Sequence, residues 1–340
     1  VLAVTVGLLG WGLAEMTANG TPGLSAFALT IVAAAFGTLL APWRWLYLAA
    51  LAMLMLVQGG WSTIADSRAG LRTRSYFGIY TVRDYPESRT RNLAHGTTLH
   101  GQQSTDPAMR RFPSTYYGPG SGAGIALANA DRLYGPHARI GVVGLGTGTL
   151  ACYRQPGQTW RFFEIDPVVL AYSRNRTFTY LADCAPDARV VLGDARLELA
   201  RFPASLDMLA IDAFSSDAIP LHLLTDEAFG VYLDALSPRG VLLIHISNRF
   251  IELEPVLAAE ARARGLAALV RDDIPPGAGG LTASSWVAMS RDPAQLQAMQ
   301  RSAPAFAWQR LKPPAPRVWT DDHASILPYI RWTNFLINTH

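Results

Sequence analysis

The stretch IGVVGLGTG, residues 140–148, is the most informative segment of the chain. A β-branched apolar run there breaks into Gly144, Gly146 and Gly148. Glycines let the backbone approach a ligand closely, and a helix that begins after them directs its free N–H groups at the same place. The pattern predicts a nucleotide-binding turn between a strand and a helix. Glu164 follows the apolar run WRFF, at the position where such folds hold a ribose through both hydroxyls.

Two later predicted strands also end in carboxylates. The segment ARVVLGDARLELA, residues 188–200, predicts a strand that ends at Asp194, and LDMLAIDAF, residues 206–214, predicts one that ends at Asp212. Strands that alternate with helices form a parallel sheet, and open α/β sheets bind ligands at its carboxyl edge. Asp194 would there accept a hydrogen bond from the exocyclic amine of adenine. The alternative is that both acids cap the helices that follow them.

The strings GLGTGTLACY, FFEIDP, VVLGDARLELA and IDAFSSDAIPLHLLTDEAF resemble the spermidine synthase family of aminopropyltransferases, in particular its membrane-fused bacterial branch. The resemblance covers residues 75–330, approximately. It implies an α/β fold whose mostly parallel, Rossmann-like sheet is that of the class I S-adenosylmethionine-dependent methyltransferases. It also implies that Gly144, Gly146 and Gly148 form the cofactor-binding turn. By the same resemblance, Glu164 binds the ribose, Asp194 binds the adenine and Asp212 is the catalytic acid residue.

The resemblance also implies how the acceptor is bound. Asp212 would accept a proton from the attacking amine, with Asp217 and Tyr117 as the other catalytic residues. In the synthases a small β domain lids the cleft, and LHGQQ resembles its L-D-G-x-Q string, so that Gln103 is expected to face the cofactor. The residues expected to bind the acceptor are Tyr116, Ser215, Ser216 and Asp322.

The chain departs from the family pattern in three places. The synthases usually carry an acid in the glycine turn, where this chain has Leu145 and Thr147. Their compact acid pair is stretched here, because Asp212 and Asp217 are five residues apart. Their Tyr-His-Glu stretch is represented by residues 116–118, Tyr-Tyr-Gly.

Residues 75–124 alternate apolar and polar side chains between turns, which predicts strands and hairpins. His95 and His100 are five residues apart, so in one strand they would lie on opposite faces, which argues against a shared metal. Structural hydrogen bonding is the expected role of each, and no metal site is expected.

The rest of the core continues the pattern. TDEAFGVYLDALSPRG predicts a helix with Thr225 as its N-cap and Gly240 after its end. GVLLIHIS predicts the fifth strand, ELEPVLAAEARARG an amphipathic helix, and SSWVAMSRD a late edge strand. The glycine-rich and proline-rich residues 274–281 are expected to form a mobile loop. Asp321, Asp322 and His323 form a solvated turn in one interpretation and approach the cleft in the other.

The first 65 residues contain only two charged side chains, Glu15 and Arg44. Three hydrophobic helices are predicted there, at about 1–16, 24–41 and 44–59, each near the lower length limit for crossing a bilayer. A buried hairpin is the alternative. Basic residues 68, 72 and 74 follow the third helix and predict a multi-pass protein of the inner membrane with a cytoplasmic catalytic domain. Cys152 and Cys184 are buried free thiols in one interpretation, and in the other they form a bridge, which would favour the periplasm.

The predicted organisation is a membrane region at 1–60, a small β domain with a linker at 61–120, and an S-adenosyl-binding domain at 121–335. The net charge of +3 forms no dense basic stripe, so nucleic acid is not expected as a partner. The third glycine of the dinucleotide pattern is replaced by Thr149, which disfavours a dehydrogenase. The expected partners are a small amine and the lipid bilayer, and a homodimer is left open.

Three classes of function remain. The first is aminopropyl transfer from decarboxylated S-adenosylmethionine to an amine, with methylthioadenosine as the second product. The second is methyl transfer from S-adenosylmethionine, which leaves S-adenosylhomocysteine. The third is a non-catalytic cofactor-binding module. An amine is protonated near neutral pH and needs a base such as Asp212, which favours the first class.

Overall fold

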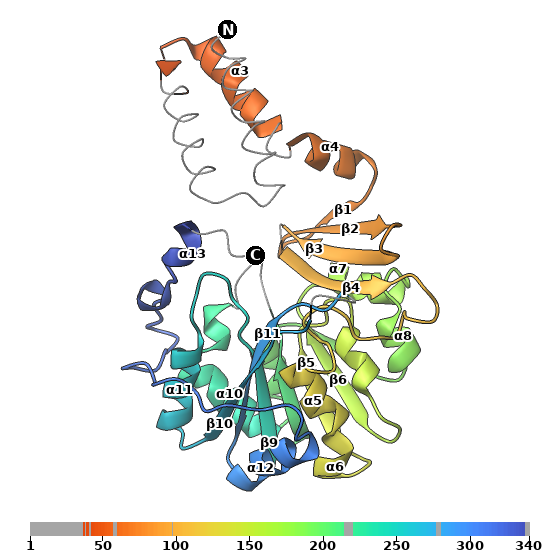
Figure 1. Ribbon diagram of the computed structural model, residues 1–340, viewed down its shortest axis with the longest axis vertical. Helices are drawn as coiled ribbons and strands as arrows, with labels where there is room; N and C mark the ends of the chain where they lie inside the picture. Colours follow the sequence, from red (N-terminus) through yellow and green to blue (C-terminus); the bar gives the residue numbers. More distant parts are fainter. Residues whose placement is uncertain are drawn as a thin grey trace. The chain divides into compact units, whose positions relative to one another are not determined.

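A computed structural model describes residues 37, 39–40, 42–56, 60–96, 98–213, 220–276 and 280–336 of the chain (Figure 1). The chain divides into two compact units. The first comprises Val1–Arg72, Arg249–Ile251 and Tyr329–His340, and the second comprises Thr73–Asn248 and Glu252–Pro328. The predicted hydrophobic helix 1–16 and nearly all of 24–41 lie outside the described residues.

The described part of the first unit is mainly helical. It contains α3 (Arg44–Met55), α4 (Trp61–Arg68) and α13 (Thr333–Leu336). The third predicted hydrophobic helix, 44–59, corresponds to α3 as far as Met55, and residues 57–59 are not among those described. Within the described ranges, no helix combines the length and the apolar character needed to cross a membrane.

The second unit is built on a seven-stranded sheet whose strand order is β10-β11-β9-β8-β5-β6-β7. Strands β5 to β9 are parallel, and β11 pairs antiparallel with both β9 and β10. This confirms the predicted mixed α/β, Rossmann-like sheet. The strand bounds are β5 Arg139–Val143, β6 Thr159–Glu164, β7 Arg189–Leu192, β8 Leu206–Ile211, β9 Leu236–His245, β10 Ala267–Asp273 and β11 Ser284–Ser290.

Helices cover both faces of this sheet, which is why its central strands read as continuous apolar runs (Figure 1). Helices α5 and α12 pack against β11, and α10 packs against β9. The helix bounds are α5 Gly122–Ala128, α6 Ala130–Tyr134, η2 Thr149–Tyr153, α7 Pro167–Arg174, α8 Tyr180–Cys184, α9 Ala195–Leu199, η3 Leu221–Leu223, α10 Asp226–Ala235, α11 Glu254–Ala263, α12 Pro293–Ser302 and η4 Leu327–Tyr329.

A second, four-stranded sheet precedes the large one in sequence, with the order β1-β2-β3-β4. Strands β2, β3 and β4 are antiparallel neighbours, as the alternating pattern of residues 75–124 predicts. Their bounds are β1 Arg72–Arg74, β2 Ile79–Tyr85, β3 Thr90–His95 and β4 Thr98–Ser104.

Two predictions about the later core are wrong. Helix α10 does begin at the Thr225 cap, but it ends at Ala235 and β9 starts at the next residue, so Gly240 lies inside the strand. Strand β11 is not at the edge, because β10 adds outside it. The sequence AALVRDD of β10 has only a short apolar run, as is common in an edge strand, which has a neighbouring strand on one side only. The loop predicted at 274–281 is described except for residues 277–279.

The two cysteines are bridged, which is the second of the two interpretations of the sequence. Cys152 of η2 and Cys184 of α8 form a disulfide, with their Cα atoms 4.8 Å apart. Both elements are short helices that pack against each other, and η2 directly follows the glycine turn. The bond therefore fastens the segment after the glycine turn to α8.

Replacing both cysteines by serine should lower the free energy of unfolding by about 2–4 kcal/mol, because the bridge closes a loop of intermediate length in the unfolded chain. Urea unfolding of the full chain, oxidised and reduced, measures the difference. Reduction should lower the urea midpoint of the wild type and leave that of the double variant unchanged. Equal stability of oxidised and reduced wild type would contradict the assigned bridge.

Candidate active site

A cavity of about 290 Å³ opens at the carboxyl ends of β5, β6 and β8 in the second unit. The large sheet supplies the glycine turn and three carboxylates to its wall, which are those of Glu164, Asp194 and Asp212. The small sheet supplies Tyr80, His95 and His100. The carboxyl-edge acids that the sequence predicts thus come together on one cavity.

The glycine turn follows β5 directly. Gly144, Gly146 and Gly148 all have positive φ, at 91°, 52° and 86°. A Cβ on Gly144 would lie 2.3 Å from the carbonyl oxygen of Asp212, so no other residue fits there. Gly144 and Gly146 line the cavity, whereas Gly148 packs against α8. The helix after the turn is the five-residue 3-10 helix η2.

Glu164 ends β6 and is almost fully buried. Its Oε2 accepts a hydrogen bond from the N–H of Leu145 at 2.9 Å, and its Oε1 accepts one from the N–H of Asp166 at 2.8 Å. Burial raises the pKa of this carboxyl, and the two backbone donors oppose that rise. Each oxygen keeps a second lone pair, so the carboxylate can still accept from two hydroxyls of a ligand.

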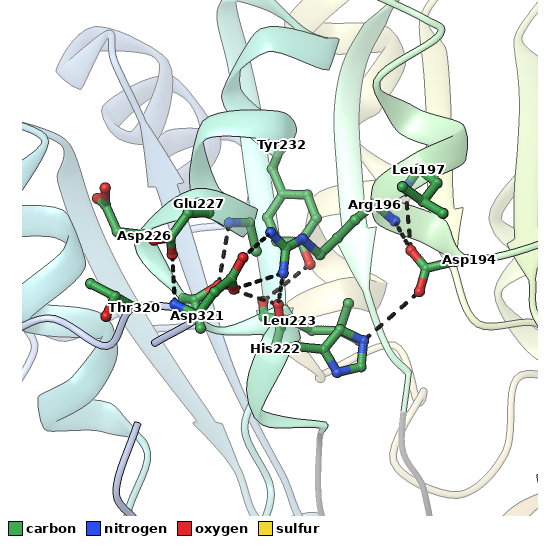
Figure 2. Close-up of polar contacts among 12 residues, drawn as sticks. Asp194, Arg196, Leu197, His222, Leu223, Asp226, Glu227, Tyr232, Thr320 and Asp321 are labelled. Carbon is green, nitrogen blue, oxygen red and sulfur yellow. Dashed lines mark hydrogen bonds and ion pairs between the residues drawn. The ribbon is translucent and has the colours of Figure 1, made fainter. Parts of the chain in front are cut away.

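Asp194 caps α9, as the alternative interpretation of the sequence predicts. Its Oδ1 accepts from the N–H groups of Arg196 and Leu197 at 2.9 and 3.2 Å (Figure 2). Its Oδ2 lies 4.0 Å from Nε2 of His222, and both residues line the cavity. One oxygen of Asp194 is therefore used for capping, and the other faces the side of the cavity that His222 lines.

Asp212 follows β8 and has a different environment. Its side chain is 6% exposed, and each of its two oxygens has a partner. Tyr117 donates its hydroxyl to Oδ2, and Nδ1 of His245 lies 2.7 Å from Oδ1. Burial and the charge of Asp212 raise the pKa of both Tyr116 and Tyr117, so the two phenols stay neutral and can donate.

His245 is a site residue that the sequence analysis missed. It occupies the last position of β9, next to β8 in the sheet, and its side chain is 4% exposed. The signal was a lone histidine in the apolar run GVLLIHIS, at the same edge as the predicted acids. Its ring stacks on Trp286, with centroids 4.6 Å apart, and on Tyr116, with centroids 5.0 Å apart.

The prediction that His95 and His100 lie on opposite faces of one strand is wrong. They belong to β3 and β4, which pair antiparallel, and their ring centroids are 5.2 Å apart. A tight turn between the strands therefore brings the rings together on the cavity wall. Among the described residues, no three His, Cys, Asp or Glu side chains are grouped as metal ligands.

Several predicted site residues lie elsewhere. The amide of Gln103 is buried outside the cavity lining, where it bonds Thr179 and the carbonyl of Arg110. Asp322 is exposed and does not line the cavity. Residues 214–219 are not described, so that the predicted roles of Ser215, Ser216 and Asp217 remain predictions.

The neighbour of Asp322 has the structural role instead (Figure 2). Asp321 forms two hydrogen bonds with the guanidinium of Arg196, at 2.9 and 2.8 Å, and accepts the hydroxyl of Thr225 at 2.7 Å. Arg196 also donates to the carbonyl of His222 at 2.9 Å. The late Thr-Asp-Asp string thus reaches the cavity indirectly, by fixing the backbone that carries His222.

The guanidinium of Arg196 lowers the pKa of Asp321 to about 2. Because this pKa is depressed on folding, the stabilisation is present above the ordinary aspartate pKa of about 4 and is lost as the pH falls through about 2. Asp321→Asn should therefore lower the melting temperature near neutral pH and have less effect as the pH approaches 2. Melting curves between pH 2 and 7 test this, with Asp322→Asn as the exposed control. A difference in melting temperature between the wild type and Asp321→Asn that stays constant across that pH range would count against the ion pair.

No protein-family model matches the chain. In sequence it is similar to a probable polyamine aminopropyl transferase of Bifidobacterium longum (strain NCC 2705), 24% identical over 169 residues, which are 50% of this chain and 36% of that relative. It is also similar to a polyamine aminopropyltransferase of Vibrio vulnificus (strain CMCP6), 32% identical over 133 residues, which are 37% of this chain and 42% of that relative. The matched segments thus span less than half the length of these curated relatives.

Solved structures share the fold. A probable spermidine synthase from Corynebacterium glutamicum ATCC 13032 has a TM-score of 0.52 and 16% identity, covering 75% of this chain and 96% of that protein. A spermidine synthase from Thermotoga maritima has a TM-score of 0.50 and 15% identity, covering 74% of this chain and 80% of that protein. The sequence relatives are thus named as polyamine aminopropyltransferases, and the chain shares its fold with spermidine synthases.

Proposed function

We propose that the protein is a transferase that moves an aminopropyl group from decarboxylated S-adenosylmethionine to a small amine. The observation that carries this proposal is the position of Asp212. It lies on the cavity wall beside the glycine turn, and Tyr117 donates a hydrogen bond to one of its oxygens. The side chain of Asp212 is itself almost fully buried. The names of the sequence relatives support the same reaction class.

The residues present fit an S-adenosyl donor. Gly144 and Gly146 give the ligand access to backbone on the cavity wall, and Glu164 offers a carboxylate already oriented by two backbone N–H groups. Asp194 offers a second acceptor farther along the sheet edge. In this proposal Glu164 holds the ribose and Asp194 holds the adenine. The donor, when bound, supplies a carbon activated by its positively charged sulfur.

The chemistry that remains for the protein is alignment and proton removal. An ammonium acceptor gives one proton to Asp212 and becomes a free amine. The amine nitrogen then forms a bond to the carbon next to sulfur while the carbon–sulfur bond breaks, and the electron pair stays on a neutral thioether. Tyr117 keeps Asp212 oriented by its hydrogen bond. The low exposure of Asp212 keeps water away from this step.

We also propose that residues 1–65 attach the protein to a membrane. Only two charged side chains occur in that segment, and α3 exposes large apolar groups such as Trp45 and Met55. The bridged cysteines favour an oxidising compartment for the second unit, opposite to the orientation predicted from the arginines. A donor made in the cytoplasm would then have to reach that side, and protease protection in intact cells decides between the two orientations.

The proposal is tested with the full chain in detergent, each of the two S-adenosyl donors and a panel of amines. Mass spectrometry should find methylthioadenosine together with an aminopropylated amine. S-Adenosylhomocysteine as the product would identify a methyltransferase instead. Binding of donor without any turnover would support the cofactor-binding module.

In the same assay, Asp212→Asn should lower turnover by about 10²-fold or more, which is the usual scale for a positioned base. The amide keeps the shape of the side chain but cannot accept the proton of the ammonium. Donor affinity should change little. Full turnover by Asp212→Asn on the preferred amine would refute the role of this residue as a base. Asp187→Asn, on the exposed loop before β7, is the matched control.

Glu164→Ala should abolish donor binding, because the charge-assisted contact with the ribose is lost from a preformed site. Glu164→Gln keeps one acceptor oxygen for the backbone N–H groups and should bind weakly while remaining folded. Calorimetry with methylthioadenosine measures the affinities, and circular dichroism checks the fold. Glu87→Ala, in an exposed turn, is the control. Unchanged affinity in both Glu164 variants would exclude the ribose assignment.

A further inference from the structure

A histidine with no role in the chemistry above lies against the proposed base. Nδ1 of His245 is 2.7 Å from Oδ1 of Asp212, and both side chains are almost completely buried. Asp212 lines the cavity, whereas His245 does not. An acceptor amine can therefore reach Asp212 but meets His245 only through it.

The far side of the ring is also bonded. Nε2 of His245 lies 2.6 Å from the hydroxyl oxygen of Ser247, and that oxygen accepts the backbone N–H of Ser285 at 2.8 Å. The backbone N–H can only donate, so the serine oxygen has already used one lone pair on it. Its own hydrogen is then available for Nε2. A ring that accepts at Nε2 carries its proton at Nδ1, where the partner is the carboxylate of Asp212.

Packing holds the ring in this orientation. His245 pairs directly with Trp286 across β9 and β11, and their rings are nearly parallel, with an angle of 12° between the planes. Tyr116 stacks on the ring as well, at an angle of 26°. Gly122 leaves room for Trp286, because a Cβ there would lie 2.5 Å from the Cβ of Trp286. The imidazole is therefore confined between two aromatic rings, with its nitrogens directed at Asp212 and Ser247.

The order of the three groups differs from that of a serine hydrolase triad. In a serine hydrolase the serine faces the substrate and the carboxylate lies behind the histidine. Here the carboxylate lines the cavity, and Ser247 lies at the far end. The same three side chains thus orient a carboxylate and do not activate a nucleophile.

We propose that His245 is a positioning residue for the base Asp212, donating from Nδ1 as a neutral ring whose tautomer is fixed by Ser247. The proposal rests on the proposed function. Tyr117 and His245 each occupy one lone pair on a different oxygen of Asp212, so each oxygen keeps one lone pair for the ammonium of the acceptor. Hydrogen bonds to the charged form also stabilise the carboxylate inside the cavity. Among the described residues, the titratable groups whose pKa responds to the charge of Asp212 are Tyr116 and Tyr117, both neutral phenols.

The ring state is measured without any substrate. Two-bond ¹H–¹⁵N correlation spectra of the full chain, labelled with ¹⁵N-histidine, should assign His245 to the neutral form protonated at Nδ1 near pH 7.5. The signal is identified among the seven histidines by its absence in His245→Asn. Ser247→Ala removes the hydroxyl that donates to Nε2 and should weaken the preference for the ring protonated at Nδ1, which the ¹⁵N shifts of both ring nitrogens report. A wild-type ring protonated at Nε2, or at both nitrogens, would overturn the proposal.

Kinetics test the effect on the base. His245→Phe keeps the aromatic packing but removes the donor, and should lower kcat by about tenfold to hundredfold, as expected for one hydrogen bond to a charged group. The loss destabilises the carboxylate, so the acidic limb of the kcat/KM profile should move to higher pH by about one unit. His245→Asn places an amide N–H where Nδ1 was. This variant should retain most of kcat and keep the acidic limb near its wild-type pH. His137→Phe, on the surface, is the control.

An acidic limb that stays in place in both His245→Phe and Ser247→Ala would overturn the positioning role, and so would equal defects in His245→Phe and His245→Asn. If His245→Phe does not fold, Ser247→Ala still decides, through its tautomer and its pH profile. If the wild type transfers nothing from either donor, the proposed function fails, and the spectra still determine the state of the ring.

Discussion

The site depends on the close approach of two strand ends. The backbone after β5 passes so near the end of β8 that Gly144 has no room for a side chain against the carbonyl of Asp212. The N–H of Asp212 in turn donates to the carbonyl of Val143 at 2.8 Å. This contact fixes the glycine turn and the carboxylate of Asp212 relative to each other before any ligand binds. In the proposed reaction, a donor held by the turn and an amine held by Asp212 are thereby brought to the same place.

The three carboxylates of the site are all held by donors from the protein. Backbone N–H groups hold Glu164 and one oxygen of Asp194, whereas Asp212 is held by two side chains, Tyr117 and His245. The difference fits their proposed tasks. A carboxylate that only accepts hydroxyl groups from a ligand can be held by rigid backbone. Asp212, the proposed base, is instead held by a phenol and an imidazole, and the imidazole is fixed between two aromatic rings.

The sequence predicts the parallel part of the fold well, because each strand there combines an apolar run with a polar residue at its end. Glu164, Asp194 and Asp212 were found in that way and lie on one cavity. Strand β10 lacks this combination, so the sequence analysis placed β11 at the edge of the sheet, where β10 lies. His95 and His100 were misplaced because strand periodicity says nothing about a turn between them. His245 and Asp321 act through partners far along the chain, and no local pattern indicates those partners.

The bridge between Cys152 and Cys184 has a consequence for the covalent architecture. The ring of chain that it closes contains the whole of β6 and α7, and with them Glu164. A single protease cut in that ring would leave the two pieces joined, and they would migrate together until a reductant was added. The edge of the site that carries Glu164 can therefore lose a peptide bond without separating from the glycine turn.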